Sequence, residues 1–278
     1  MPDNHPKNAH DYPAAQVEAA KRVLVELSDI LGAYREKYRL VGGWVPAMLY
    51  PEGRHVGSID IDILLNHTRL EEGNDIVRLL EQHGYERNAK QTYTFSRKVT
   101  IDGITFVVDV DFLAGKYRGK RTGRRTQHIQ DLKARMAPGG QFAFEQDARQ
   151  IELQAPRPDG SQNTVQVAVV DELPFLCMKA AAFDDREKAK DAYDIHFILE
   201  HHPGGFSQLA VEAIPHARQG IVKSMLGILE KLFAKPSSAG CTAVADFEEE
   251  HDEESREIRL RQVSERIMAF VRAMRGEA

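Results

Sequence analysis

The sequence has little cysteine and no long apolar run, and each absence excludes a class of protein. Its 278 residues include two cysteines, Cys177 and Cys241, which lie far apart and without the spacing of metal ligands. So few cysteines predict a protein whose thiols are reduced, and they argue against a disulfide framework. No apolar run reaches the length of about 18 residues that a membrane span needs, and the polar first residues lack the apolar core of a signal peptide. We therefore expect a cytoplasmic protein without a membrane-spanning segment.

The sequence also lacks an excess of positive charge. Its 37 lysine and arginine residues stand against 42 aspartate and glutamate residues, which gives a net charge of −5. The chain as a whole is therefore no polycation that binds nucleic acid through its overall charge. An apolar fraction of 42% is enough for a core, and a length of 278 residues predicts two compact domains or one large one.

The periodicity of apolar residues predicts an α/β (α+β) fold in which a mixed sheet domain is followed by a helical domain. We expect a disordered leader at residues 1–13, the sheet domain at 14–170 and the helical domain at 171–278. In the sheet domain we expect helices at 14–31, 44–50 and 70–83, and strands at 38–41, 59–65, 91–100, 104–113, 150–153 and 164–169. Asp102-Gly103 predicts a two-residue hairpin turn between two of these strands.

A glycine pair followed by two aspartates is the first candidate site. Gly42 and Gly43 follow the expected strand 38–41 and supply a turn at which the backbone can approach a ligand closely. Asp60 and Asp62 share one face of the next strand, because alternate side chains of a strand point the same way. Adjacent carboxylates repel each other unless a cation lies between them, and hard oxygen ligands suit Mg²⁺. The alternative is a strand with one solvated face, which also alternates aspartate with isoleucine.

A second acidic strand supports the metal site. Asp109 and Asp111 alternate in the expected strand 104–113 and again share one face. Either could supply a third carboxylate to the first pair, and we favour Asp111 over Asp109. The alternative is that both carboxylates face water beside the hairpin.

The segment from Lys116 to Arg135 is locally basic, with eight lysine and arginine residues and one acidic residue, Asp131. In a chain of negative net charge, such a segment could attract the phosphates of RNA or of a nucleotide. The alternative is a solvated flexible loop, and Gly119 and Gly123 argue against fixed structure here.

Two motifs together resemble a known family. Residues 42–43 and 58–62 have the order Gly-Gly, short helix, Ser-Ile-Asp-Ile-Asp, and residues 190–194 read Lys-Asp-Ala-Tyr-Asp. The chain resembles the nucleotidyltransferase superfamily that includes DNA polymerase beta, and within it the AbiEii/AbiGii-type toxin family. The strand ending Val110-Asp111-Phe112-Leu113 matches the family's third-carboxylate strand, and Lys179 matches its earlier helical lysine. Trp44 departs from the pattern, because a serine or threonine usually follows the glycines.

The resemblance implies a nucleotidyltransferase fold and an enzyme of the EC 2.7.7 type. The cofactor it implies is Mg²⁺ (or Mn²⁺). The expected reaction transfers a nucleoside monophosphate from an NTP, ATP among them, to an acceptor hydroxyl. RNA, and tRNA in particular, is the expected acceptor, and the expected partner is an antitoxin protein. The metal ligands implied are Asp60, Asp62 and Asp111, with Asp109 and Asp191 as further catalytic candidates. The nucleotide-binding residues implied are Gly42, Gly43, Ser58, Lys179 and Lys190.

Two alternatives follow from the same residues. The chain could be a non-catalytic nucleotide- or RNA-binding module that keeps the fold, which the departure at Trp44 favours. It could also transfer the nucleotide to a small molecule such as an aminoglycoside, since the same carboxylates would serve that reaction.

Overall fold

The computed structural model describes residues 6–66, 76–115, 126–129 and 132–277. The chain forms two compact units. We call Pro13–Leu49 with Gly57–Phe175 the sheet unit, and Met1–Tyr12 with Tyr50–Val56 and Leu176–Ala278 the helical unit. The short segment Tyr50–Val56 lies between two parts of the sheet unit in sequence and belongs to the helical unit.

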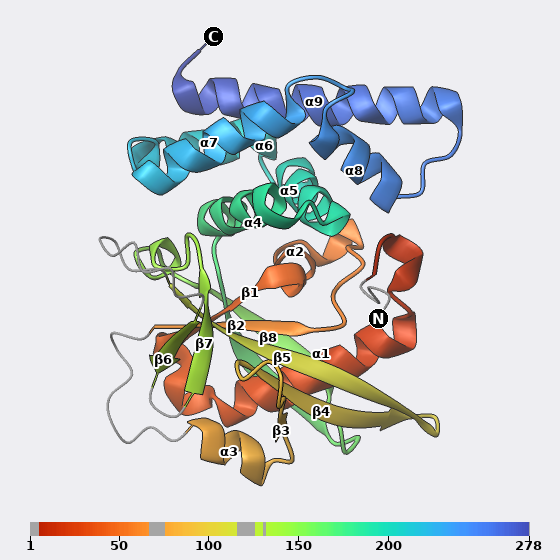
Figure 1. The fold of residues 1–278 in the computed structure, drawn as a ribbon, viewed down its shortest axis with the longest axis vertical. Coiled ribbons are helices and arrows are strands. Elements are labelled where there is room, and N and C mark those ends of the chain that lie inside the picture. Colours follow the sequence, from red (N-terminus) through yellow and green to blue (C-terminus); the bar gives the residue numbers. More distant parts are fainter. Residues whose placement is uncertain (1–5, 67–75, 116–125, 130–131, 278) are drawn as a thin grey trace. The chain divides into compact units, whose positions relative to one another are not determined.

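The sheet unit is built on a mixed sheet whose strands, among the described residues, have the order β3-β4-β5-β2-β1-β9-β8, with β7 also on β5 and β6 on β7 (Figure 1). The strands are β1 (Tyr38–Val41), β2 (Ile61–Leu65), β3 (Glu86–Arg87), β4 (Thr94–Ile101), β5 (Ile104–Gly115), β6 (Thr126–Ile129), β7 (Leu132–Ala137), β8 (Arg149–Pro156) and β9 (Gln162–Val169). The helices are α1 (Ala14–Ile30), α2 (Val45–Leu49) and α3 (Ile76–Gln82). The predicted α/β fold is confirmed.

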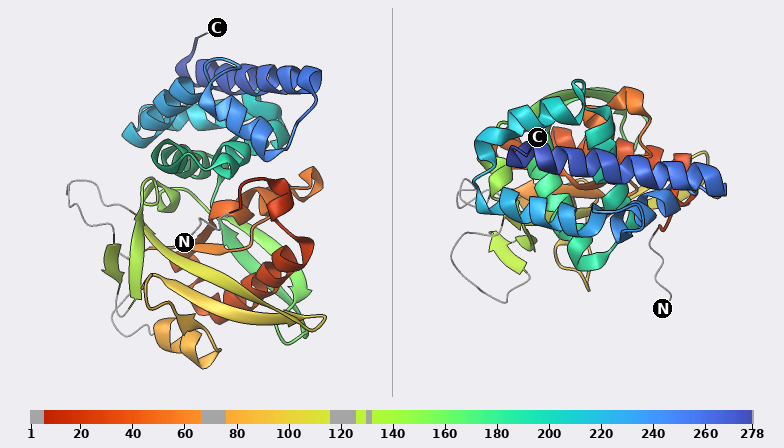
Figure 2. Two further views of the ribbon diagram at one scale, coloured as in Figure 1. Left: turned by 45° about the vertical axis from the view of Figure 1, so that its right-hand side comes forward. Right: turned by 90° about the horizontal axis from the view of Figure 1, so that it is seen from above.

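Helix α1 covers one face of this sheet (Figure 1 and Figure 2). Its apolar side chains Val23, Leu24 and Leu27 are fully buried. Glu26 of α1 binds the guanidinium of Arg97 in β4 at 2.9 and 3.0 Å. Because side chains alternate along β4, Arg97 and Thr94 point to opposite faces. The residues that share the face of Thr94 therefore lie on the side of the sheet away from α1.

The predicted hairpin is confirmed. Strands β4 and β5 are antiparallel, with Ile101 opposite Ile104. Asp102 and Gly103 have φ of 50° and 80°, which are the left-handed values that a two-residue turn of this kind needs. Strands β8 and β9 extend the sheet as expected, because β9 pairs with β1.

Two expectations differ from the structure. Strand β2 begins at Ile61 rather than Ile59, so Asp60 lies just before it. The C-terminal part of the basic segment contains β6 and β7, where Leu132 and Ala134 are buried in alternation with Lys133 and Arg135. This alternation stabilises a strand in spite of the charges. Residues 116–125 and 130–131 of that segment, and 70–75 of the expected helix 70–83, lie outside the described residues.

The expected disordered leader is also corrected for its described part. Residues 8–12 include a short 3-10 helix (Ala9–Asp11) that is capped by Asn8. Tyr12 is buried with its ring centroid 5.9 Å from that of Phe247. Burial of an aromatic ring stabilises this segment on the helical unit.

The helical unit consists of α4 (Glu172–Arg186, which begins in the sheet unit), α5 (Ala189–His201), α6 (Gly205–Ala213), α7 (Gly220–Phe233), α8 (Ala239–Phe247) and α9 (Glu253–Arg275). Helix α9 packs against α5, α6, α7 and α8 (Figure 2). Asp252 caps its N-terminus with a carboxylate that accepts a hydrogen bond from the Ser255 amide, and Gly276, with φ of 72°, caps its C-terminus. In the part of the chain that the structure describes, no helix has the length and hydropathy to cross a membrane.

Candidate active site

Asp62 and Asp111 lie side by side on the face of the sheet opposite α1. Strand β2 pairs with β1 on one side, where Asp62 is opposite Val41, and with β5 on the other, where Asp62 is opposite Asp111. Paired residues of neighbouring strands direct their side chains to the same face. The strand register therefore places two carboxylates next to each other, both partly buried.

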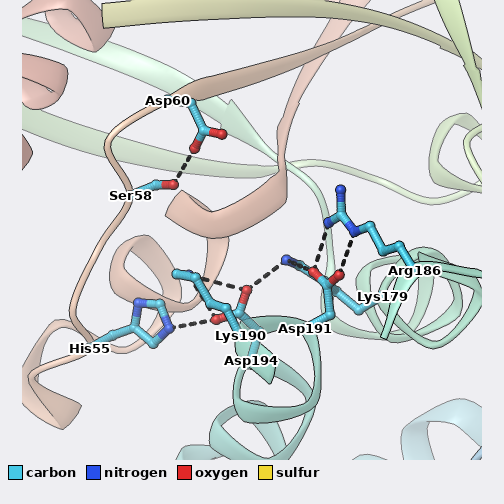
Figure 3. Close-up of polar contacts among 8 residues, drawn as sticks. All are labelled: His55, Ser58, Asp60, Lys179, Arg186, Lys190, Asp191 and Asp194. Atoms are coloured by element: carbon cyan, nitrogen blue, oxygen red, sulfur yellow. Dashed lines mark hydrogen bonds and ion pairs between the residues drawn. The ribbon is translucent and has the colours of Figure 1, made fainter. Parts of the chain in front are cut away.

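Asp60 is held by Ser58. The buried Ser58 hydroxyl donates a hydrogen bond to Asp60 Oδ1 at 2.5 Å (Figure 3). In this structure Ser58 therefore orients a carboxylate, and its predicted contact with a nucleotide phosphate stays a prediction.

The structure favours Asp111 over Asp109 as the third carboxylate. Asp109 lies beyond the residues of β5 that pair with β2, is exposed, and accepts a hydrogen bond from Ser96 at 2.6 Å. Asp111 is beside Asp62, and its Oδ1 accepts a hydrogen bond from Thr94 at 2.5 Å. Burial raises the pKa of Asp111, the Thr94 hydrogen bond and the charge of Arg135 oppose this rise, and the charges of Asp60 and Asp109 add to it.

Gly42 leaves room for Asp62. A Cβ added to Gly42 would lie 1.9 Å from Asp62 Oδ2, far inside contact distance. Gly42 also has φ of 74°, which side chains with a Cβ adopt only with strain. The turn therefore brings the backbone directly against a carboxylate, and the predicted approach of Gly42 and Gly43 to a ligand stays a prediction. The neighbouring Trp44 is buried close to Gly57, so it fills the core instead of supplying a hydroxyl.

We expect a Gly42→Ala substitution to abolish activity and to lower the free energy of unfolding. The added methyl group must displace Asp62, and the left-handed backbone adds about 1–2 kcal/mol of strain. Gly160→Ala is the matched control, because Gly160 has φ of 86° and a Cβ there would meet nothing within 4 Å. Urea unfolding and an activity assay of both variants measure the difference. Equal losses in the two variants would contradict a specific role of Gly42.

The helical unit holds a buried group of charges around Asp191 and Asp194 (Figure 3). Lys179 Nζ lies 2.8 Å from Asp191 Oδ1 and 2.6 Å from Asp194 Oδ2. Lys190 Nζ lies 2.9 Å from Asp194 Oδ1, and Arg186 donates two hydrogen bonds to Asp191 at 2.7 and 3.0 Å. Burial alone would raise the pKa of Asp194, but Lys179 and Lys190 outweigh it and hold that pKa well below its usual range.

The loop before Ser58 is bound to this group through His55. The buried ring of His55 lies with Nε2 2.9 Å from Asp194 Oδ1 and stacks on Tyr193 at 5.2 Å between centroids. Burial, and then the charge of Lys190, lowers the pKa of His55 to about 4. His55 is therefore neutral near pH 7, and its Nε2–H donates to the Asp194 carboxylate.

The predicted site residues thus fall into two groups. Within the sheet unit the structure brings together Gly42, Ser58, Asp60, Asp62 and Asp111. Within the helical unit it brings together Lys179, Lys190 and Asp191. In this structure both lysines are counter-ions of buried aspartates, so a role in binding triphosphate stays a prediction, as does a catalytic role of Asp191.

Sequence reasoning missed Thr94, His55 and the specific position of Arg135. Thr94 and Asp111 are 17 residues apart, and His55 and Asp194 are 139 residues apart. A threonine at the start of a strand and a histidine in a loop have no local pattern that indicates so distant a partner. Strand pairing between 91–100 and 104–113 was the one signal that could have indicated Thr94.

The sheet carboxylates fit a divalent metal that obtains its other ligands from a substrate. Within the described ranges, no group of three or more His, Cys, Asp and Glu side chains is arranged to hold an ion by itself. Mg²⁺ commonly binds one or two protein carboxylates together with substrate phosphates and water. The neighbouring carboxylates of Asp62 and Asp111 match that donor set, and the turn at Gly42 lies against Asp62.

Comparison with known proteins identifies the family of the chain. No curated protein matches the sequence. The family model described as nucleotidyl transferase AbiEii toxin, type IV toxin–antitoxin system, matches residues 27–274, which includes the sheet carboxylates and the charged group of the helical unit. The chain therefore belongs to the AbiEii family of nucleotidyl transferase toxins.

Proposed function

We propose that this protein is a Mg²⁺-dependent enzyme that transfers a nucleoside monophosphate from an NTP to a hydroxyl of RNA, with tRNA as one acceptor. The acceptor oxygen forms a bond to the α-phosphorus, the bond from that phosphorus to the bridging oxygen breaks, and pyrophosphate leaves. The observation that supports this function best is the register of β2 on β5, which makes Asp62 and Asp111 neighbours.

The protein residues have separate parts in this proposal. Asp60, Asp62 and Asp111 would hold the metal, which supplies positive charge to the phosphates in the transition state. The backbone at Gly42 and Gly43 would approach the phosphates, since the two glycines have no side chains of their own. Thr94 engages Oδ1 of Asp111, which leaves Oδ2 as the oxygen to orient the acceptor hydroxyl and receive its proton.

Positively charged side chains near the carboxylates favour RNA over a small cationic acceptor. Lys133 and Arg135 of β7 are partly exposed, and Arg135 acts on the pKa of Asp111. Positive side chains at this position attract backbone phosphates and repel a cation such as an aminoglycoside. The type IV toxin–antitoxin description of the family further supports an antitoxin as the partner that restrains the enzyme.

The test compares the wild type with an Asp60→Ala/Asp62→Ala variant, each incubated with labelled NTPs, Mg²⁺ and total RNA. We expect label to enter RNA with the wild type alone, and only while Mg²⁺ or Mn²⁺ is present. Isothermal titration of NTP distinguishes the enzyme from a non-catalytic binding module. The module would bind NTP without metal and would transfer no nucleotide. Equal labelling by the two proteins would end the enzymatic interpretation.

A further inference from the structure

The edge of β5 changes its partner next to Asp111. Strand β4 pairs with β5 up to Thr94, which is opposite Asp111, and β7 pairs with β5 from Arg135, which is opposite Leu113. Tyr93, the residue before Thr94, accepts a hydrogen bond at its carbonyl from the Phe112 amide at 2.9 Å. Tyr93 and Arg135 therefore meet at the point where one strand replaces the other.

Arg135 lies on the carboxylate face. Asp111 and Leu113 point to one face of β5 because they are two residues apart, and Arg135 is paired with Leu113. Its guanidinium carbon lies 5.8 Å from the centroid of the Tyr93 ring. Consistent with this placement, the charge of Arg135 opposes the rise that burial causes in the pKa of Asp111.

The guanidinium of Arg135 is placed to bind an anion. Several arginines of the sheet unit are paired with carboxylates, as Arg97 is with Glu26 and Arg149 is with Asp171. Across the ranges that the structure describes, Arg135 has no such ion pair, and its contact is the aromatic ring. A planar guanidinium held on a ring presents several donors in the geometry that a phosphate accepts.

The strand order decides which substrate this arginine meets. The glycine turn follows β1, Asp62 is on β2, Asp111 is on β5, and Arg135 with Tyr93 lies beyond β5, in that order across the sheet. If the glycine turn receives the phosphates of the NTP, Asp111 separates that position from Arg135. The position beyond Asp111 is then the one from which an acceptor hydroxyl would approach.

We propose that Arg135 and Tyr93 form a subsite for the acceptor, in which the Arg135 guanidinium binds a backbone phosphate of the RNA next to its reacting nucleotide. The Tyr93 ring holds the guanidinium in position. This inference rests on the proposed nucleotidyl transfer to RNA and adds to it a specific contact that selects an acceptor with a phosphate backbone.

The test is Arg135→Ala, with Arg135→Lys as the conservative variant. With a single-stranded RNA oligonucleotide, we expect KM for RNA to rise about 10-fold, in line with the loss of a hydrogen bond to a charged group. The kcat value and the KM for NTP should stay within about twofold of the wild type. The slope of log RNA affinity against log salt should become shallower by about 0.7, the value for one phosphate contact on a single strand. Arg135→Lys should recover part of the affinity.

Arg87→Ala is the matched control. The Arg87 guanidinium lies 5.4 Å from the ring centroid of Phe95, the residue after Thr94, whose side chain points to the opposite face of the sheet. This substitution removes the same charge from a similar aromatic contact and should leave the RNA parameters unchanged. An unchanged KM and salt slope for Arg135→Ala, or a rise in KM for NTP in place of RNA, would overturn the inference.

Direct RNA binding separates this inference from the proposed function. Fluorescence anisotropy with the same oligonucleotide can be measured on an Asp62→Asn protein, with and without Arg135→Ala. Wild-type transfer with RNA binding that does not depend on Arg135 would refute the subsite alone. Absence of wild-type transfer to RNA would refute the proposed function, and the subsite with it.

Discussion

An Asp62→Asn variant is expected to lose nucleotidyl transfer by at least about 100-fold while it keeps or increases its stability, since charges aimed at a reacting centre are worth this much. Asparagine preserves the size of the side chain and removes its negative charge. The Asp62 carboxylate lies beside Asp111 and against the turn at Gly42. Removal of its charge therefore lowers the repulsion between the neighbouring carboxylates. Functional sites often sacrifice stability in this way. Label transfer and urea unfolding of the same preparation measure both effects.

Asp109→Asn is the control for that variant. Asp109 is an aspartate of the same face, but it is exposed and bound to Ser96 rather than placed beside β2. We expect this variant to keep transfer within about threefold, as for a group outside the reacting centre. Induced expression in a bacterium gives a second readout, in which the wild type and Asp109→Asn arrest growth and Asp62→Asn does not. Equal losses in both variants would contradict the choice of Asp111 over Asp109.

An Asp194→Ala variant is expected to lose about 3–5 kcal/mol of unfolding free energy, the range measured when one partner of a buried ion pair is removed. The Asp194 carboxylate is fully buried and contacts Lys179, Lys190 and His55. Its removal leaves two buried ammonium groups with less compensating charge. Because folded domains are stable by only about 5–15 kcal/mol, soluble yield should also fall. Urea unfolding followed by circular dichroism measures the change.

Asp184→Ala is the matched control for the buried aspartate. Asp184 forms an ion pair with Lys231 at 2.8 Å, and both side chains are exposed. Surface pairs of this kind contribute little to the free energy of unfolding, because water screens both charges. A loss of similar size in Asp194→Ala would show that the buried charges do not stabilise the helical unit as the structure indicates.

The sequence by itself determined the elements that depend on local pattern. Alternating aspartate and isoleucine predicted a strand that carries both Asp60 and Asp62, and in the structure Asp62 is in β2 while Asp60 lies just before it. Asp102-Gly103 predicted the hairpin that joins β4 and β5. Both signals act over a few residues, because side-chain alternation and left-handed turn residues are local properties of the backbone. The two motifs were also enough to indicate the family, which the match over residues 27–274 then established.

Only the tertiary structure decided which distant residues meet. The parallel pairing of β2 with β5 selects Asp111 as the neighbour of Asp62, and the pairing of β7 with β5 brings Arg135 to the same face. Such pairings depend on how strands far apart in sequence align, and a shift of one residue would turn every side chain to the other face. His55 and Asp194 likewise meet across 139 residues. No local pattern contains that information, because folding alone buries these residues and brings the partner charges next to them.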